Sequence, residues 1–301
     1  MKPNDTGKFL NPIYLDLPLL LTLSVVSVLG LVVLYSAGQG DLNLVIGQAM
    51  RLSLGFTIML VLAQVPPRYF RFWSPWIYLS GILLLLAVVA VRDISRGARR
   101  WLDLGVLRFQ PSEIMKVAVP MTMAWFFSDK PLPPCWRHLL GGVLLTGIPF
   151  ILIARQPDLG TALVVGCAGA SVLFLAGLSW ILMIGLAGIL SAVLPLFWTF
   201  VMHDYQRQRV LTFLDPETDP LGAGYHIIQS RIAIGSGGIY GKGWLNGTQS
   251  HLDFLPEGST DFIFAAFSEE FGLVGSCLLL ILYFSIVARC LHLATRAPDT
   301  Y

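Results

Sequence analysis

An aspartate stands where a polar segment of this chain changes into a strongly apolar one. The stretch 255–264 reads LPEGSTDFIF, and Asp261 lies directly before its apolar end. A carboxylate at the mouth of a membrane helix is energetically costly unless it caps the helix or takes a proton. Asp261 is therefore the first candidate for a catalytic residue, acting as a general base.

Two interpretations of this carboxylate remain open. Ser259, Thr260 and Asp261 are all residue types that cap the N-termini of helices. A carboxylate that accepts backbone N–H bonds is a poorer base, whereas desolvation by Phe262 and Phe264 would make it a better one. The sequence does not decide between capping and catalysis.

A second pair of charges follows a proline at 111. Pro111 suits the first turn of a helix, which places Glu113 in that turn and Lys116 three residues later on the same face. The pair is either a Glu favoured by the helix dipole beside a Lys that reaches the interface, or a buried ion pair that faces a cavity.

Asp158 lies between a proline and a glycine in the stretch 155–161, RQPDLGT. It is either a turn or N-cap residue or part of a site on the same outer surface as Lys116 and Asp261. Farther along, the glycine-rich stretch 235–243 lies near Arg231 and contains Lys242. Exposed backbone amides beside cations can hold phosphate oxygens, although the glycine spacing matches no P-loop or dinucleotide-binding motif.

The composition places these residues in a membrane protein. Hydrophobic residues make up 55% of the 301 residues and charged residues only 13%, about half of the usual charged share of a soluble chain. The four cysteines lie in or beside apolar segments without metal-ligand spacing, which argues against a disulfide framework or a zinc site. The first apolar run is of full spanning length, so we expect a retained helix rather than a cleaved signal.

The apolar runs predict an all-α polytopic bundle of about eight membrane helices in a single domain over 1–301. A large extracytoplasmic loop, 202–261, precedes the last helix. The expected spans are 17–37, 49–65, 73–91, 111–127, 139–154, 160–177, 178–201 and 262–290.

The orientation of the bundle is less simple. Lys2 and Lys8 precede the first span, which predicts a cytoplasmic N-terminus. The inner side then carries Lys2, Lys8, Arg68, Arg71, Lys130, Arg137, Arg289 and Arg296. The outer side carries more cations: Arg51, Arg92, Arg96, Arg99, Arg100, Arg108, Lys116, Arg155, Arg207, Arg209, Arg231 and Lys242. Either the chain is inverted, or the outer cations bind an anionic ligand; we favour the second interpretation.

Four segments together resemble the SEDS family of polytopic glycosyltransferases (shape, elongation, division, sporulation). They are 109–113 (FQPSE), 156–161 (QPDLGT), 237–243 (GGIYGKG) and 251–257 (HLDFLPE), the last running into 260–264 (TDFIF). They occur in the family's order over two thirds of the chain, and the form of the last segment resembles the rod-shape branch more than the division branch.

The resemblance implies a peptidoglycan glycosyltransferase in the bacterial inner membrane. Its substrate would be lipid II, a disaccharide-pentapeptide on undecaprenyl pyrophosphate, and its active site would face outward. Asp261 takes the family's catalytic position, and Glu113, Lys116 and Asp158 match its other functional positions. The family usually has ten spans, whereas this sequence supplies eight. A class B penicillin-binding transpeptidase is the implied partner. We expect membrane lipids around the bundle, and we expect no nucleic acid partner.

Sugar transfer from a diphosphate needs a base for the acceptor hydroxyl and positive charge for the leaving group. We expect Asp261 to be the base. The supporting cations would come from Arg51, Arg99, Arg100, Lys116, Arg207, Arg209 and Lys242, together with a divalent cation, Mg²⁺ or Mn²⁺. Two other functions stay open: a flippase for lipid-linked substrates, and a non-catalytic membrane partner of a transpeptidase.

Overall fold

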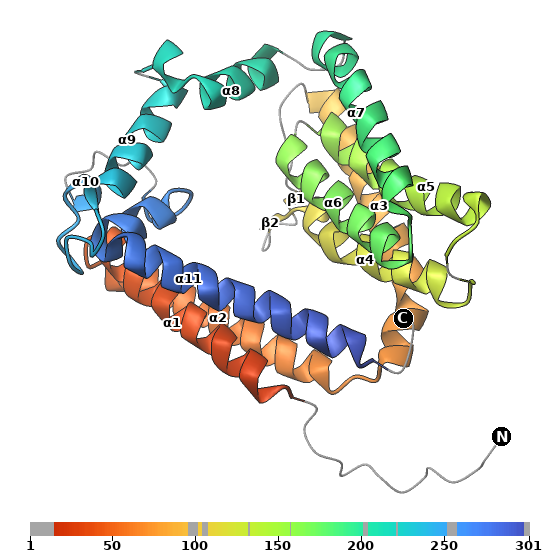
Figure 1. Ribbon diagram of the computed structural model, residues 1–301, viewed down its shortest axis with the longest axis horizontal. Helices are drawn as coiled ribbons and strands as arrows, with labels where there is room; N and C mark the ends of the chain where they lie inside the picture. The colour runs from red at the N-terminus through yellow and green to blue at the C-terminus, as the bar shows by residue number, and fades with distance from the viewer. Residues whose placement is uncertain are drawn as a thin grey trace, which may run out of the picture. The chain divides into compact units, whose positions relative to one another are not determined.

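The computed structural model describes residues 15–95, 102–103, 108–131, 133–156, 158–200, 204–220, 222–251 and 258–297. This part of the chain is helical apart from its turns and one short hairpin (Figure 1). It forms two compact units. The Asp261 unit comprises the described residues within 1–64 and 203–297, and the Asp158 unit those within 65–202.

The Asp261 unit is built on three long helices. They are α1 (Leu17–Ala37), α2 (Leu42–Ala63) and α11 (Ile263–Thr295), with α1 in contact with both of the others (Figure 1). The shorter elements of this unit are α8 (Asp204–Leu214), the 3-10 helix η1 (Pro216–Thr218), α9 (Ala223–Ser236) and α10 (Thr248–His251). Of these, α9 packs along α11.

Contacts at both ends fix α1 antiparallel to α11. At the start of α1, Asp16 caps the helix by accepting from the backbone N–H of Leu19, and it also pairs with Arg289 near the end of α11. At the other end of α1, the hydroxyl of Ser36 donates to the carboxylate of Glu270. The start of α11 therefore lies beside the end of α1.

Helix α11 is broken at Gly272, whose backbone is non-helical at φ 64° and ψ −161°. The break leaves carbonyls and N–H groups without helical partners, and the segment 237–243 supplies them. Lys242 N donates to Glu269 O at 3.0 Å and Gly243 N to Glu270 O at 3.0 Å. On the far side of the break, Leu273 N donates to Gly238 O at 2.9 Å. A broken helix of this kind is tolerated at membrane depth only when such partners are present.

The Asp158 unit is a bundle. Its helices are α3 (Pro67–Ser95), α4 (Pro111–Ser128), α5 (Trp136–Arg155), α6 (Leu159–Leu175) and α7 (Trp180–Phe200). Helix α4 contacts α3, α5 and α6, and its fully buried Met115, Val119 and Met123 form the centre of the core. A short hairpin precedes α4. Its two strands, β1 (Leu102–Asp103) and β2 (Arg108–Phe109), have two residues each and pair antiparallel.

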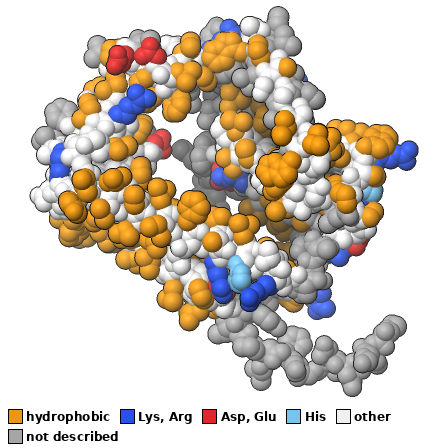
Figure 2. Space-filling view, in the orientation of Figure 1, with side chains coloured by type: hydrophobic (Ala, Val, Ile, Leu, Met, Phe, Trp, Pro, Cys, Tyr) orange, Lys and Arg blue, Asp and Glu red, His pale blue; other side chains and the backbone are white. Residues whose placement is uncertain are grey.

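Each of the eight expected spans contains a helix, and the all-α fold class is confirmed. Within the described residues, five helices are long and apolar enough to cross a membrane: Leu17–Ala37, Leu42–Ala63, Pro67–Ala90, Trp136–Arg155 and Ile263–Thr295. Large apolar side chains face outward from them, for example Leu54 and Phe284, which are 62% and 77% exposed. Figure 2 shows hydrophobic side chains spread widely over the visible face of the described residues. The chain is a multi-pass membrane protein.

Several helix bounds differ from the expected spans; α3, for example, runs over Pro67–Ser95 rather than 73–91. Helix α2 begins at Leu42 rather than at 49, because Asp41 caps it by accepting from the N–H of Asn43. Within the expected extracytoplasmic loop 202–261 the structure describes four helical elements, α8, η1, α9 and α10. Helix α9 gains stability by packing on α11, a contact that composition alone does not indicate. The prediction of one domain over 1–301 stays a prediction.

Candidate functional site

Asp261 lies just outside the start of α11 and does not cap it. The N-cap residue is Phe262, and no side chain makes a capping hydrogen bond there. The Asp261 side chain is exposed, and within the described residues it forms no hydrogen bond or ion pair. The capping interpretation of Asp261 is therefore wrong, and its carboxylate is left available beside the positive end of a helix dipole.

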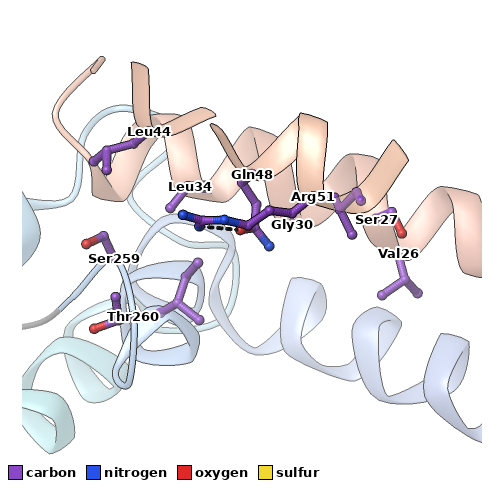
Figure 3. A pocket seen from close by; sticks show the side chains of 11 residues that line it. Val26, Ser27, Gly30, Leu34, Leu44, Gln48, Arg51, Ser259 and Thr260 are labelled. Carbon is purple, nitrogen blue, oxygen red and sulfur yellow. Dashed lines mark hydrogen bonds between the residues drawn. The ribbon is translucent and has the colours of Figure 1, made fainter. Parts of the chain in front are cut away.

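A cavity of about 520 Å³ is lined in part by Ser259, Thr260 and Ile263, which flank Asp261 in the sequence; Asp261 itself is not among the lining residues. It lies between α1, α2 and the segment that leads into α11, so it belongs entirely to the Asp261 unit (Figure 3). Its lining residues are Val26, Ser27, Gly30, Leu34, Leu44, Gln48, Arg51, Leu52, Ser259, Thr260 and Ile263. The volume lies within the usual range of ligand sites, about 300–1,000 Å³.

Arg51 is the charged residue among those lining residues. Figure 3 shows its guanidinium between the helices and the segment of Ser259 and Thr260, with a hydrogen bond from Nη1 to Gln48 Oε1 at 3.4 Å. Arg51 is exposed, so its charge is accessible to a ligand. A cation and hydroxyls beside aliphatic walls suit an anionic group attached to a hydrocarbon chain.

Lys242 is placed differently from the sequence expectation. Its ammonium forms an ion pair with Glu269 at 2.7 Å and donates to Thr248 Oγ1 at 2.7 Å. The Glu269 side chain is fully buried, with 0% exposed, and it also accepts from the backbone N–H of Gln249 at 3.0 Å. The charge of Lys242 is thus offset by a buried carboxylate of its own protein.

The glycine-rich stretch around Lys242 lies too close to α11 for side chains. A Cβ at Gly237 would be 2.1 Å from the carbonyl oxygen of Ser268, and a Cβ at Gly241 2.0 Å from that of Glu270. Gly241 also has a φ of +81°. The backbone amides of Lys242 and Gly243 bond to α11 rather than pointing at a phosphate position. The glycines serve close packing, and the expected cradle for phosphate oxygens is not formed by these two amides.

In the Asp158 unit the aspartate caps a helix. Asp158 is the N-cap of α6: its Oδ1 accepts from Thr161 N at 3.2 Å and its Oδ2 from Thr161 Oγ1 at 2.9 Å. Oδ2 also accepts from Gln110 Nε2 at 2.9 Å, which joins the starts of α4 and α6. The N-cap interpretation of Asp158 is confirmed. Two of the segments that carried the family resemblance meet at this bond.

Glu113 and Lys116 form the expected pair one turn apart on α4, at 2.7 Å. The pair lies at the surface of its unit, with 52% of the Glu113 side chain and 36% of the Lys116 side chain exposed. The alternative of a buried ion pair is wrong in this structure. Exposed pairs of this kind contribute only about 0–1 kcal/mol to stability.

The remaining predicted cations are only partly described. Arg207 lies half-buried on α8. Arg209 lies on the same helix, but its side chain is outside the described part of the structure, and Arg99 and Arg100 lie outside the described residues altogether. Their roles stay predictions.

A metal site is not assigned. Among the described residues, no group of three or more His, Cys, Asp or Glu side chains is close enough to hold a metal ion. The residues present around the cavity do not fit a divalent cation site, and the expected Mg²⁺ or Mn²⁺ stays a prediction.

Some residues at the site are not predicted by the sequence. Ser259 and Thr260 are expected there only as capping residues, and Gln48 is not expected at all. The spacing of Gln48 and Arg51, three residues apart on a helix, is a signal that could have indicated their contact. The pairing of Glu269 with Lys242 has no local signal, because 27 positions of sequence separate them.

The family model described as "Cell cycle protein", which covers FtsW, RodA and SpoVE, matches residues 12–301. The chain belongs to the FtsW/RodA/SpoVE family. The resemblance found in the sequence motifs is therefore confirmed.

Relatives within this family carry names that agree with the predicted enzyme class. The chain is 51% identical to the peptidoglycan glycosyltransferase MrdB of Escherichia coli K12, over all of this chain and 82% of that protein. It is 35% identical to the probable peptidoglycan glycosyltransferase FtsW of Coxiella burnetii, over 83% of this chain and 67% of that protein. The higher identity to the first agrees with the rod-shape branch.

Solved structures of the family have the same fold. The crystal structure of the rod shape determining protein RodA of Thermus thermophilus has a TM-score of 0.64 at 29% identity, over 95% of this chain and 77% of that one. A second structure, described as "Structural coordination of polymerization and crosslinking by a peptidoglycan synthase complex", has a TM-score of 0.75 at 33% identity, over 95% of this chain and 80% of that one.

Proposed function

We propose that this member of the FtsW/RodA/SpoVE family is a peptidoglycan glycosyltransferase that polymerises lipid II into glycan strands during cell elongation. The observation that carries the proposal is the available carboxylate of Asp261 in a segment that lines a cavity together with a cation and aliphatic walls. Its family membership and the names of its relatives support the enzyme class.

In this reaction Asp261 takes the proton of the acceptor sugar's 4-hydroxyl. The hydroxyl oxygen then bonds to the anomeric carbon of the donor while the bond from that carbon to the diphosphate breaks. The products are a longer glycan strand and undecaprenyl pyrophosphate. A single carboxylate suits direct inversion at the anomeric carbon, and a positioned base contributes about 10²–10⁴ in rate.

Arg51 is the cation best placed for the anionic group of the substrate, because it reaches into the cavity next to Ser259 and Thr260. The aliphatic side chains of α1 and α2 would contact the first part of the polyprenyl chain. The supporting roles expected of Lys116, Glu113 and Asp158 stay predictions. Lys242 does not bind the substrate in this proposal, because its charge is already neutralised by the carboxylate of Glu269.

The proposed orientation places Asp261 on the outer side of the bacterial inner membrane, with the N-terminus in the cytoplasm. Arg289, His292 and Arg296 lie toward the end of α11, and the Asp16–Arg289 pair puts this end beside the start of α1. Positive charges favour the cytoplasmic side, which leaves the opposite end of α11, and Asp261, facing outward.

A class B penicillin-binding transpeptidase is the proposed partner. The fold that this chain shares with a peptidoglycan synthase complex, in which polymerisation and crosslinking are coordinated, supports this part of the proposal. Co-purification of the two membrane proteins from detergent extracts tests it, and separate elution would contradict it.

A flippase is the second candidate, because broken helices with buried acids are typical of transporter binding sites. Helix α11 is broken at Gly272, and Glu269 and Glu270 are buried just before the break. Both carboxylates, however, are bonded within the protein, to Lys242 and Ser36. This argues for a structural break rather than a transport site. A lipid II scrambling assay in liposomes separates the two functions.

The decisive experiment measures polymerisation of purified lipid II by the native protein and by Asp261→Asn. Asparagine cannot take the proton, so we expect polymerisation to fall by at least about 10² with the fold unchanged. Asp41→Asn is the matched control: Asp41 is an aspartate that caps α2, and asparagine caps equally well. Native activity in Asp261→Asn would overturn the assignment.

The same assay with EDTA, and with Mg²⁺ or Mn²⁺ restored, tests the predicted divalent cation.

A further inference from the structure

Glu269 is a buried carboxylate that accepts hydrogen bonds from four residues. Its oxygens accept from Lys242 Nζ at 2.7 Å, Gln249 N at 3.0 and 3.2 Å, Thr248 Oγ1 at 3.1 Å and Ser236 Oγ at 3.4 Å. The side chain has no exposed surface. A buried carboxylate is stable only when it is paired and hydrogen-bonded in this way. The donors come from α9, the glycine-rich stretch and α10, so one side chain joins three segments to α11.

These bonds enclose the stretch of chain that carries Asp261. The Gln249 amide and the Glu269 carboxylate are 20 positions apart in the sequence, and Asp261 lies between them. On the Glu269 side, the stretch from Ala265 to Glu270 is buried in the unit. On the Gln249 side, the carboxylate is bonded to the first turn of α10. Bonds on both sides of Asp261 in the sequence restrict the positions that the described residues 258–264 can take.

The backbone adds a second set of bonds to the same junction. Lys242 N and Gly243 N donate to the carbonyls of Glu269 and Glu270, each at 3.0 Å. The Lys242 side chain therefore meets Glu269 from a backbone that is already fixed against α11. The ion pair therefore fixes the position of the Glu269 side chain as well as neutralising its charge.

We propose that Glu269 is a positioning residue for polymerisation: with Lys242, Thr248 and the Gln249 amide it holds the start of α11 and the residues 258–262 that lead into it, and so holds Asp261 in place. This inference rests on the proposed function, because it gives Glu269 a role in the reaction assigned to Asp261. Glu269 does not touch substrate; it acts through the placement of the base.

The kinetic test compares Glu269→Gln, Lys242→Gln and the double variant with the native protein on lipid II. Each single change is expected to lower kcat about ten- to hundredfold, since displacement of a catalytic group by about 1 Å costs that much. KM for lipid II should change less than kcat, because Arg51 and the cavity residues of α1 and α2 lie outside the stretch that Glu269 holds. The kcat of the double variant should be higher than that of Lys242→Gln alone, because that single variant leaves a buried carboxylate without its cation.

The Asp16–Arg289 pair provides the matched control. It has the same N–O distance of 2.7 Å, lies in the same unit and also binds α11, but at the end away from Asp261. Asp16→Asn should reduce thermal stability and leave kcat at the native value. Equal losses of kcat in Asp16→Asn and Glu269→Gln would show that both effects come from lost stability, and would overturn the positioning role.

Amide hydrogen exchange tests the inference without using activity. In Glu269→Gln the amides of 244–251 and 258–262 should exchange faster than in the native protein, whereas in Asp16→Asn they should not. Unchanged exchange in both segments overturns the inference, and so does faster exchange with an unchanged kcat. If the native protein fails to polymerise lipid II, the proposed function fails, and the exchange result still decides whether Glu269 holds this stretch.

Discussion

Asp158 and Asp261 each come directly before an apolar helix, yet their carboxylates do different things. Asp158 caps α6 and accepts from Gln110, so both of its oxygens are used within the protein. Asp261 precedes a helix whose N-cap residue, Phe262, makes no side-chain capping bond, and its own carboxylate is exposed. The comparison shows that a capping residue type before a helix is not evidence of capping.

The surroundings of the two aspartates are also stabilised differently. The Asp158 carboxylate obtains two of its three bonds from Thr161, three positions away. The stretch that carries Asp261 is held by groups far along the chain, such as Lys242 on Glu269 and the glycines packed on α11. An aspartate that is free to react therefore needs more support from tertiary contacts than one that caps a helix.

The largest expected effect on stability comes from a glycine in the Asp261 unit, and a glycine next to Asp158 provides the contrast. Gly241→Ala would place a Cβ 2.0 Å from the Glu270 carbonyl oxygen at a φ of +81°. Overpacking and the strained backbone together should cost about 2–5 kcal/mol of unfolding free energy. Gly160→Ala, next to Asp158 on α6, meets nothing within 4 Å, and should gain up to about 1 kcal/mol. Denaturant unfolding in detergent measures both; equal effects would remove the contrast.

A smaller effect is expected at the aspartates themselves. Asp158→Ala should lower the unfolding free energy by about 1 kcal/mol, the usual value of an N-cap, and Asp158→Asn should restore most of it. Asp261→Ala should leave stability unchanged within about 0.5 kcal/mol, as for a surface site without partners. The same unfolding assay tests all three variants. A loss in Asp261→Ala as large as in Asp158→Ala would mean that Asp261 has a structural role after all.

The smallest effect is a pH dependence at a third aspartate before a helix. Asp16 caps α1, and the hydrogen bonds from Arg289 hold its pKa below the ordinary value of 3.8. A lowered pKa means that the pair stabilises the folded state above the ordinary value and loses this contribution as the pH falls through the lowered one. The Tm of the native protein should therefore fall more steeply than that of Asp16→Asn as the pH is lowered from about 5 toward about 3. Parallel curves would contradict this assignment.

The helices and the candidate base were predictable because both depend on local sequence. An apolar run of spanning length forms a helix in lipid wherever its neighbours lie, and the first span has its predicted bounds, 17–37. The spacing of Glu113 and Lys116 likewise predicts their contact on one turn of α4. Asp261 is identified by its place before an apolar helix and by the motif around it.

The roles of the other charged residues were decided only by the tertiary structure. Lys242 was expected to bind phosphate, but the partner that engages it, Glu269, is distant in sequence and becomes its neighbour because α11 breaks at Gly272. The cavity lined by the sequence neighbours of Asp261 also depends on α1 and α2 lying against the start of α11. Sequence determines which segments are helical and which residues carry charge, since these are properties of each segment. Packing determines which charges neutralise one another and which remain available for chemistry, because that depends on groups brought together from distant parts of the chain.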